Sequence, residues 1–269
     1  MTKIILNRRP QKTASFSLIE LLVVIAIVGI LSSFLLPVLA KARASAKRTQ
    51  CTNNQKQIAT VIFMYLEDNE GYYPVSHNIS TQVDYAWSWD DKLSDYDSRN
   101  LSDVDKSIWG FDVDSEQASG SQLYRCPSDA RGEVSALDKI SRSYSLNQLY
   151  TFTSWAGRGM TSNPWETDAD KVYSRSYTDV NQASESIAMA ENPYDNNSTG
   201  HQSRAVMAVE NIHAKQGDKS YWSHDLWKSN YLFVDGHVSY IYYPATYQGS
   251  GSDPWSSTDT RNTLWDCGK

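Results

Sequence analysis

The chain has 269 residues, of which 40% are hydrophobic and 21% are charged, and its formal net charge at pH 7 is −6. The charge is uneven, because eight of the 25 Lys and Arg residues but only one of the 31 acidic residues precede residue 49. Residues 49–269 therefore carry a net charge of −13, which argues against binding to a phosphate backbone as their main task. We expect no nucleic-acid partner.

An apolar segment near the N-terminus is the first predicted element. No charged residue occurs from Leu21 to Ala40, and about 20 apolar residues suffice for a helix to cross the hydrocarbon core of a membrane. We expect residues 16–40 to form a transmembrane helix and residues 41–72 to continue it. Glu20 stands at the edge of the segment, where a carboxylate is costly unless it has a partner.

The beginning of this segment carries a recognisable pattern. Four basic residues precede it, and Phe16 and Glu20 follow them. The stretch closely resembles the N-terminus of type IV prepilins and type II secretion pseudopilins. The resemblance implies that a leader, residues 1–15, is cleaved between Ser15 and Phe16, and that Phe16 is then N-methylated. It also implies that Glu20 pairs with the amine of a neighbouring subunit during assembly, although the family usually has Gly where Ser15 stands.

The resemblance further implies partners and a location. The partners are the prepilin peptidase, other pilin-like subunits, the assembly platform of the inner membrane, and membrane lipid. The chain would cross the bacterial inner membrane once, with the leader in the cytoplasm and the head, residues 73–269, in the periplasm or beyond it, where it could join a filament. Two other interpretations stay open: a secretory signal peptide cleaved after Ala40, and an unprocessed signal anchor.

The residues that follow predict an amphipathic helix packed on a head. Apolar side chains recur at helical spacing at Ile58, Val61, Ile62, Tyr65 and Leu66. Gly71 and Pro74 supply signals for the end of the helix. Residues 75–123 are rich in Ser and Asp and lack a clear period, which predicts a large loop-rich insertion.

The remainder of the head reads as strands. Candidates are Ser141–Asn147, Ser186–Glu191, Ala205–Glu210, Tyr231–Val234 and His237–Tyr243. Asp235-Gly236 between the last two predicts a hairpin over residues 231–243. The tail, residues 244–269, is rich in Ser, Gly and Asp, and we expect it to be loose. The predicted fold class is α+β and pilin-like: a long N-terminal helix packed on an antiparallel sheet.

Further segments are similar to a large bacterial subfamily of pilin-like proteins. They are Cys51–Ile58, Met64–Pro74 and the later Cys126-Pro127-Ser128-Asp129. Members of that subfamily end in a His-x9-Asp-Gly module. Here ten residues separate His224 from Asp235, so the spacing departs from that module by one.

Three cysteines are present in the chain: Cys51, Cys126 and Cys267. In an exported head, one disulfide and one remaining thiol is the simplest arrangement. We favour the Cys51–Cys126 pair, which would tie the insertion to the helix. A Cys126–Cys267 pair and three reduced thiols remain open.

One constellation could bind a divalent cation. Asp235 and His237 lie two residues apart, and His224 or His213 could approach them, so we consider His224, Asp235 and His237 as metal ligands. The alternative is that Asp235-Gly236 is simply a hairpin turn. No other cofactor is expected, because the motifs of hydrolases, phosphate-binding loops and EF-hands do not occur.

The sequence thus predicts a structural subunit without enzymatic activity, belonging to a type II secretion or type IV pilus-like assembly. The alternative is a membrane-anchored ectodomain that binds or processes carbohydrate and uses a pilin-type export signal. That function would require a groove in which tryptophans stand beside paired carboxylates. The candidates for such a groove are Trp87, Trp89, Trp109 and Trp155.

Overall fold

The structure is a computed structural model that describes most of the chain. The described residues are 17–76, 87–129, 131, 135, 138–148, 158–161, 174–192, 194, 197–199, 206–207, 212, 217, 221–248, 251, 253–257 and 259–269. They fall into two compact units that divide after Ser45, and the second unit, Ala46–Lys269, contains the end of the long helix together with the head. One helix, α1 (Leu18–Asp68), runs through both units and includes Pro37.

The end of α1 is set by two residues in the left-handed backbone region. Glu70 has φ of 53° and Gly71 has φ of 81°. The Gly71 N–H donates to the Leu66 carbonyl at 2.8 Å, which satisfies one of the carbonyls left open at a helix end. Gly71, one of the predicted stop signals, therefore closes the helix.

The head contains a five-stranded sheet in the order β3-β1-β2-β4-β5. Its strands are β1 (Tyr144–Asn147), β2 (Ile187–Glu191), β3 (Val206–Met207), β4 (Lys228–Phe233) and β5 (Val238–Tyr242). Strands β1, β2, β4 and β5 are neighbours in that order and pair antiparallel, as predicted. Strands β4 and β5 pair on either side of the Asp235-Gly236 turn.

Strand β3 differs from the all-antiparallel expectation, because it pairs parallel to β1. Strand β2 ends at Glu191, opposite Tyr144 at the beginning of β1. The chain leaves β2 at the end of the sheet where β1 begins. Strand β3 then lies on the side of β1 away from β2 and runs in the same direction as β1.

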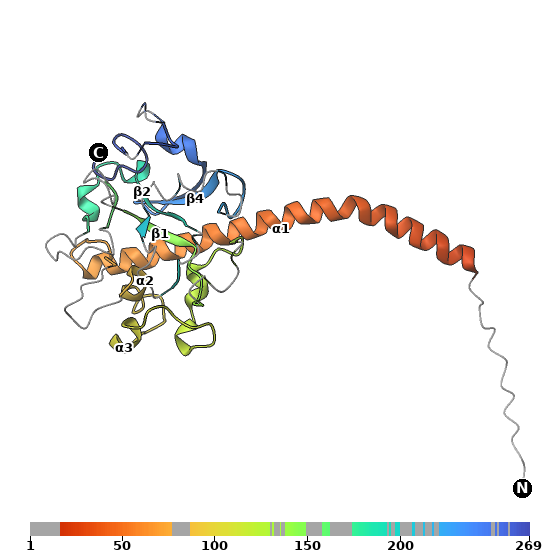
Figure 1. Ribbon diagram of the computed structural model, residues 1–269, viewed down its shortest axis with the longest axis horizontal. Helices are drawn as coiled ribbons and strands as arrows, with labels where there is room; N and C mark the ends of the chain where they lie inside the picture. The colour runs from red at the N-terminus through yellow and green to blue at the C-terminus, as the bar shows by residue number, and fades with distance from the viewer. Residues whose placement is uncertain are drawn as a thin grey trace, which may run out of the picture. The chain divides into compact units, whose positions relative to one another are not determined.

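Each face of the sheet is covered by a different segment. On one face, Ile58 and Ile62 of α1 pack in a core with Leu146, Met189 and Leu232 from the strands. Figure 1 shows the second half of α1 running beside these strands. Successive strand residues point to opposite faces, so the neighbours of Leu232 on β4, Tyr231 and Phe233, belong to a second core.

The C-terminal segment supplies the cover of this second face. Trp265 is completely buried against Tyr231 and Tyr243, and its Nε1 donates to Thr246 Oγ1 at 2.8 Å. A short 3-10 helix, η6 (Tyr243–Tyr247), begins this segment. The expectation of a loose tail is therefore wrong for residues 243–247 and 263–267, because a sheet with two apolar faces needs a cover on both.

The insertion is built from short helices without long-range strand pairing among its described residues. Its helical turns are α2 (Trp89–Lys92), α3 (Asp103–Lys106), η1 (Glu116–Ala118) and η2 (Ser121–Tyr124). Two more 3-10 turns, η4 (Tyr177–Asp179) and η5 (Ala183–Glu185), precede β2.

Candidate functional site

A disulfide joins the helix to the head. Cys51 on α1 is bonded to Cys126, with a Cα–Cα distance of 4.9 Å, and both residues are completely buried. Cys126 begins the Cys-Pro-Ser-Asp turn, which closes when the Asp129 N–H donates to the Cys126 carbonyl at 2.9 Å. The pair is the one that the sequence analysis favours, and Cys267 is a free, buried thiol.

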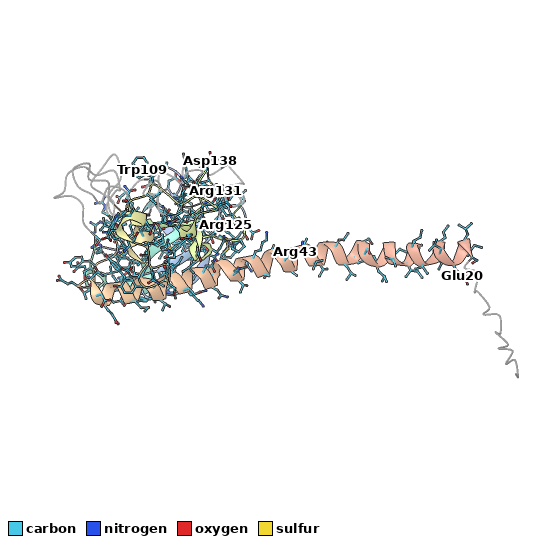
Figure 2. The ribbon with its side chains drawn as sticks, turned by 90° about the horizontal axis from the view of Figure 1, so that it is seen from below. Glu20, Arg43, Trp109, Arg125, Arg131 and Asp138 are labelled. Carbon is cyan, nitrogen blue, oxygen red and sulfur yellow. A yellow bond between two sulfur atoms is a disulfide. The ribbon has the colours of Figure 1, made fainter. Side chains whose placement is uncertain are left out.

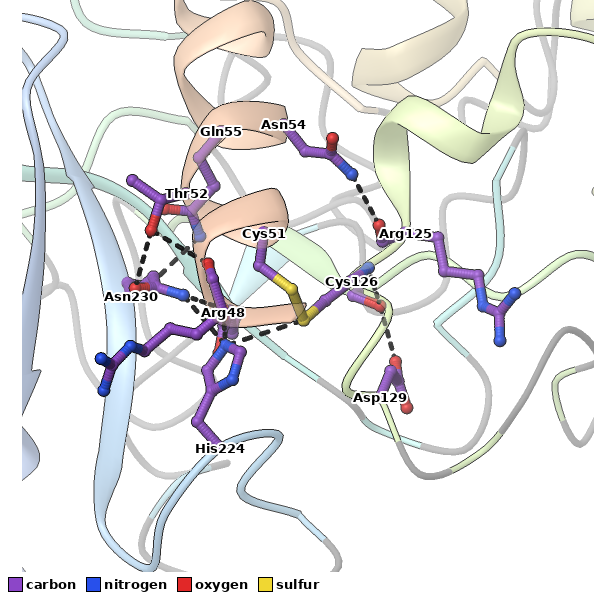
Figure 3. Close-up of a disulfide and its surroundings, with 12 residues drawn as sticks. Arg48, Cys51, Thr52, Asn54, Gln55, Arg125, Cys126, Asp129, His224 and Asn230 are labelled. Carbon is purple, nitrogen blue, oxygen red and sulfur yellow. Dashed lines mark hydrogen bonds and ion pairs between the residues drawn. A yellow bond between two sulfur atoms is a disulfide. The ribbon is translucent and has the colours of Figure 1, made fainter. Parts of the chain in front are cut away.

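A histidine lies beside the disulfide (Figure 3), and a glutamate is within hydrogen-bond distance of that histidine. His224 Nε2 is 3.7 Å from Cys126 Sγ and 3.0 Å from Glu191 Oε1. Glu191 ends β2, whereas His224 lies in the loop before β4. The side chains of His224 and Glu191 are only 4% and 1% exposed. Because water does not reach them, each needs the other as a hydrogen-bond partner.

Residues of β4 hold this pair in place. Asn230 Nδ2 donates to Glu191 Oε1 at 2.7 Å and also lies 3.0 Å from His224 Nε2. Ser229 Oγ donates to the other carboxylate oxygen at 2.8 Å. Thr52 Oγ1, one residue after Cys51, is 3.3 Å from Asn230 Oδ1, so the network continues to α1. Helix, turn and sheet therefore meet at one point.

The predicted metal ligands do not come together. His237 Nδ1 is 2.6 Å from Asp235 Oδ1 at the hairpin turn, where both side chains are partly exposed, and its ring stacks on Phe233. His224 instead packs against Tyr240, which pairs with Asn230. The extended strand from Asn230 to the end of β4 at Phe233 separates the two places by roughly 10 Å. The prediction of one site from His224, Asp235 and His237 is wrong, and His213 lies outside the described residues.

The N-terminal site is described only in part. Ser15 and Phe16 lie outside the described residues. The Ser17 N–H donates to Glu20 Oε2 at 2.8 Å, and the Glu20 N–H donates to Ser17 Oγ at 3.3 Å. This reciprocal pair is a capping box, which satisfies two backbone donors at the start of α1. The Ser-x-x-Glu spacing is a sequence signal for this second role of Glu20, beside the role in assembly that the family resemblance implies.

The tryptophans considered for a carbohydrate groove lie in different environments. Trp89 is completely buried and packs edge-on against Tyr124. The adjacent carboxylates Asp90 and Asp91 are also completely buried, and Asp90 forms an ion pair with the buried Arg142. Trp109 is half exposed, and Trp155 lies outside the described residues. This pair of carboxylates is therefore part of the interior and cannot reach a sugar.

An open cleft of about 570 Å³ lies elsewhere, near the end of α1. Its lining residues are Phe63, Leu66, Glu67, Glu70, Gly71, Tyr177 and Thr178. It combines an aromatic wall with two carboxylates, and no tryptophan contributes to it.

Two family models match the chain, one over its N-terminal segment and one over α1 and part of the head. Residues 40–178, more than half of the chain, match a family described as "Protein of unknown function (DUF1559)". The chain belongs to this family. Residues 11–36 match the prokaryotic N-terminal methylation motif, which covers Ser15, Phe16 and Glu20. This DUF1559 protein is therefore a prepilin-like or pseudopilin-like protein.

No curated protein and no solved structure matches the chain. Among the described residues, one helix, α1, is long and apolar enough to cross a membrane by length and composition. Together with the methylation motif, this helix fits a protein anchored in the inner membrane.

Proposed function

We propose that this protein is a structural subunit of a type II secretion or type IV pilus-like assembly, inserted and polymerised through α1. The observation that carries the proposal is the methylation motif on residues 11–36, together with an apolar surface that begins directly behind Glu20. The subunit has no reaction of its own. Its leader stays in the cytoplasm, and its head is exported.

The apolar surface needs a partner outside the described chain. Between Leu18 and Leu39 the large apolar side chains are 46–86% exposed, and Figure 2 shows side chains standing out around the helix between Glu20 and Arg43. Each such side chain stabilises by roughly 1.5–3 kcal/mol when it is fully buried. Lipid before assembly and neighbouring helices after assembly both provide this burial.

Processing is the first test. The mature N-terminus of the protein is read by intact-mass analysis of the membrane fraction. We expect cleavage between Ser15 and Phe16 and one added methyl group on Phe16. A chain that retains Met1, or one that starts at Lys41, would show that the segment is an anchor or an ordinary signal peptide.

Assembly is the second test, and it can separate two roles of Glu20. Glutamine at this position still completes a capping box, so Glu20→Gln keeps the helix start and removes only the charge. We expect Glu20→Gln and Glu20→Ala to remain in the membrane and to lose cross-linking between subunits almost completely. Glu67→Gln, at an exposed acid on the same helix, is the matched control and should assemble normally. Normal assembly of Glu20→Gln would contradict the pairing with the neighbour's amine.

A further inference from the structure

The buried cluster around the disulfide offers a site that subunit assembly does not use. We propose that the dithiol form of the head binds one Zn²⁺ ion through Cys51, Cys126, Glu191 and His224. The ligand atoms of these four residues all lie within 4.8 Å of one another. Both cysteines are completely buried, and the other two side chains are almost so.

The distances already approach those of a tetrahedral site. Zinc lies about 2.0–2.3 Å from nitrogen, oxygen and thiolate ligands, so neighbouring ligand atoms are roughly 3.3–3.8 Å apart. The distance from Cys126 Sγ to His224 Nε2 is 3.7 Å, and that from His224 Nε2 to Glu191 Oε1 is 3.0 Å. Breaking the disulfide and moving the two sulfurs apart completes the geometry.

The ligand types also favour zinc. Thiolates, imidazoles and carboxylates are all ligands that Zn²⁺ accepts in proteins, and two thiolates with an imidazole are typical of its closed structural sites. Three negative charges could not remain buried here without a cation, because isolated buried charges are strongly disfavoured. Ser229 and Asn230 donate to the carboxylate of Glu191 and orient it, as outer partners of metal ligands commonly do.

The metal would join the two segments that the disulfide joins and two further segments of the head. Cys51 comes from α1, Cys126 from the Cys-Pro-Ser-Asp turn, Glu191 from β2, and His224 from the loop before β4. Zinc therefore holds the head together while its thiols are reduced. Oxidation by a small-molecule disulfide forms the Cys51–Cys126 bond, passes two electrons to that disulfide to give two thiols with uptake of two protons, and releases Zn²⁺.

The test uses the full-length protein in detergent, freed of metal and reduced with a phosphine. Zn²⁺ affinity is measured by competition with a chromophoric chelator, and Co²⁺ serves as a spectroscopic probe. We expect one Zn²⁺ per reduced chain, the absorption of a tetrahedral thiolate-bound Co²⁺, and release of either metal on addition of oxidised glutathione. The oxidised protein should bind neither.

Variants assign the ligands. Glu191→Gln and His224→Ala should each weaken Zn²⁺ binding at least about 10-fold. Loss of a residue that only orients a ligand already weakens metal binding by about that factor, and these two residues would be ligands themselves. His237→Ala, at the exposed histidine of the hairpin turn, is the matched control and should bind like the wild type. Cys51→Ser combined with Cys126→Ser should abolish binding.

Two results would overturn the proposal. One is a reduced wild type that binds no more Zn²⁺ than the double cysteine variant. The other is an unchanged affinity in Glu191→Gln or His224→Ala, which would place the metal on the thiolates alone. Near-UV circular dichroism of the oxidised variants shows which are folded. If His224→Ala is not folded, the proposal is tested by the nearly isosteric Glu191→Gln and by the Co²⁺ spectrum of the wild type.

Discussion

The two parts of α1 share one secondary structure and differ in what their side chains contact. From Leu18 to Leu39 the large apolar side chains remain exposed, whereas from Cys51 to Leu66 one face of the helix is buried in the head. Helix formation is common to both, so burial alone separates their roles. In the proposed function, the first part presents its apolar surface to lipid or to other subunits, whereas the second part belongs to the core of a folded head.

Breaking the covalent link between the second part and the head should have the largest effect. The Cys51–Cys126 bond closes a loop of 75 residues, which the chain-entropy description values at about 4 kcal/mol. We expect Cys51→Ser with Cys126→Ser to lower the free energy of unfolding of the head by about that amount in urea titrations. Peptide mapping without reduction should yield a Cys51–Cys126 peptide, and a linked peptide that contains Cys267 would contradict the pairing.

Matched substitutions on the two parts of the helix test the comparison directly. Ile58 is completely buried, and Ile25 is 61% exposed. Ile58→Ala should destabilise the head by about 3 kcal/mol, because it removes a buried side chain and leaves a cavity. Ile25→Ala should leave the unfolding of the head unchanged. An equal loss of stability in both variants would show that the first part also packs within its own chain.

A buried acidic residue should make the stability of the head depend on pH. Burial, and then the neighbouring Asp90, raise the pKa of Asp91 well above its usual range. The folded state therefore holds this proton more tightly than the unfolded state, and the contribution of Asp91 to stability falls as pH rises above about 4. Asp91→Asn can still accept the N–H of Ser88 and should gain stability over the wild type as pH rises from 4 to 8. The measurement is the melting temperature of each protein as a function of pH. If the difference between Asp91→Asn and the wild type stays the same from pH 4 to 8, the raised pKa of Asp91 is contradicted.

The smallest effect concerns the third cysteine and is one of rate. Burial raises the pKa of the Cys267 thiol to about 12, so little thiolate is present at pH 8. We expect the native head to react with iodoacetamide far more slowly than the head unfolded in urea, with no change in stability before reaction. Rapid labelling of the native protein would show that the C-terminal segment opens readily.

Local patterns were sufficient for much of the fold. The apolar spacing from Ile58 to Leu66 predicted the buried face of α1, and the Asp235-Gly236 turn predicted the β4–β5 pairing. Both depend on periods and turn chemistry that act over a few residues. The expectation for the tail failed because composition alone does not show that Trp265 fills the second face of the sheet.

The candidate site was predictable only in pieces. Glu191 had no motif of its own, and it meets His224 because β2 and β4 are neighbours in the sheet. His224 was grouped with Asp235 and His237 by proximity in sequence, yet an extended strand carries those residues away from it. Contacts between segments that are 98 residues apart, such as Cys126 and His224, depend on topology.

The sequence by itself determined the N-terminal apolar segment with Phe16 and Glu20, the long helix and the hairpin, because each follows from the order of neighbouring residues. Only the tertiary structure decided which part of α1 is buried, that the C-terminal segment covers the sheet, and that Cys51, Cys126, Glu191 and His224 meet. Those outcomes depend on how distant segments pack. The free energy of burying their side chains together depends on contacts between these segments, which no local sequence pattern indicates.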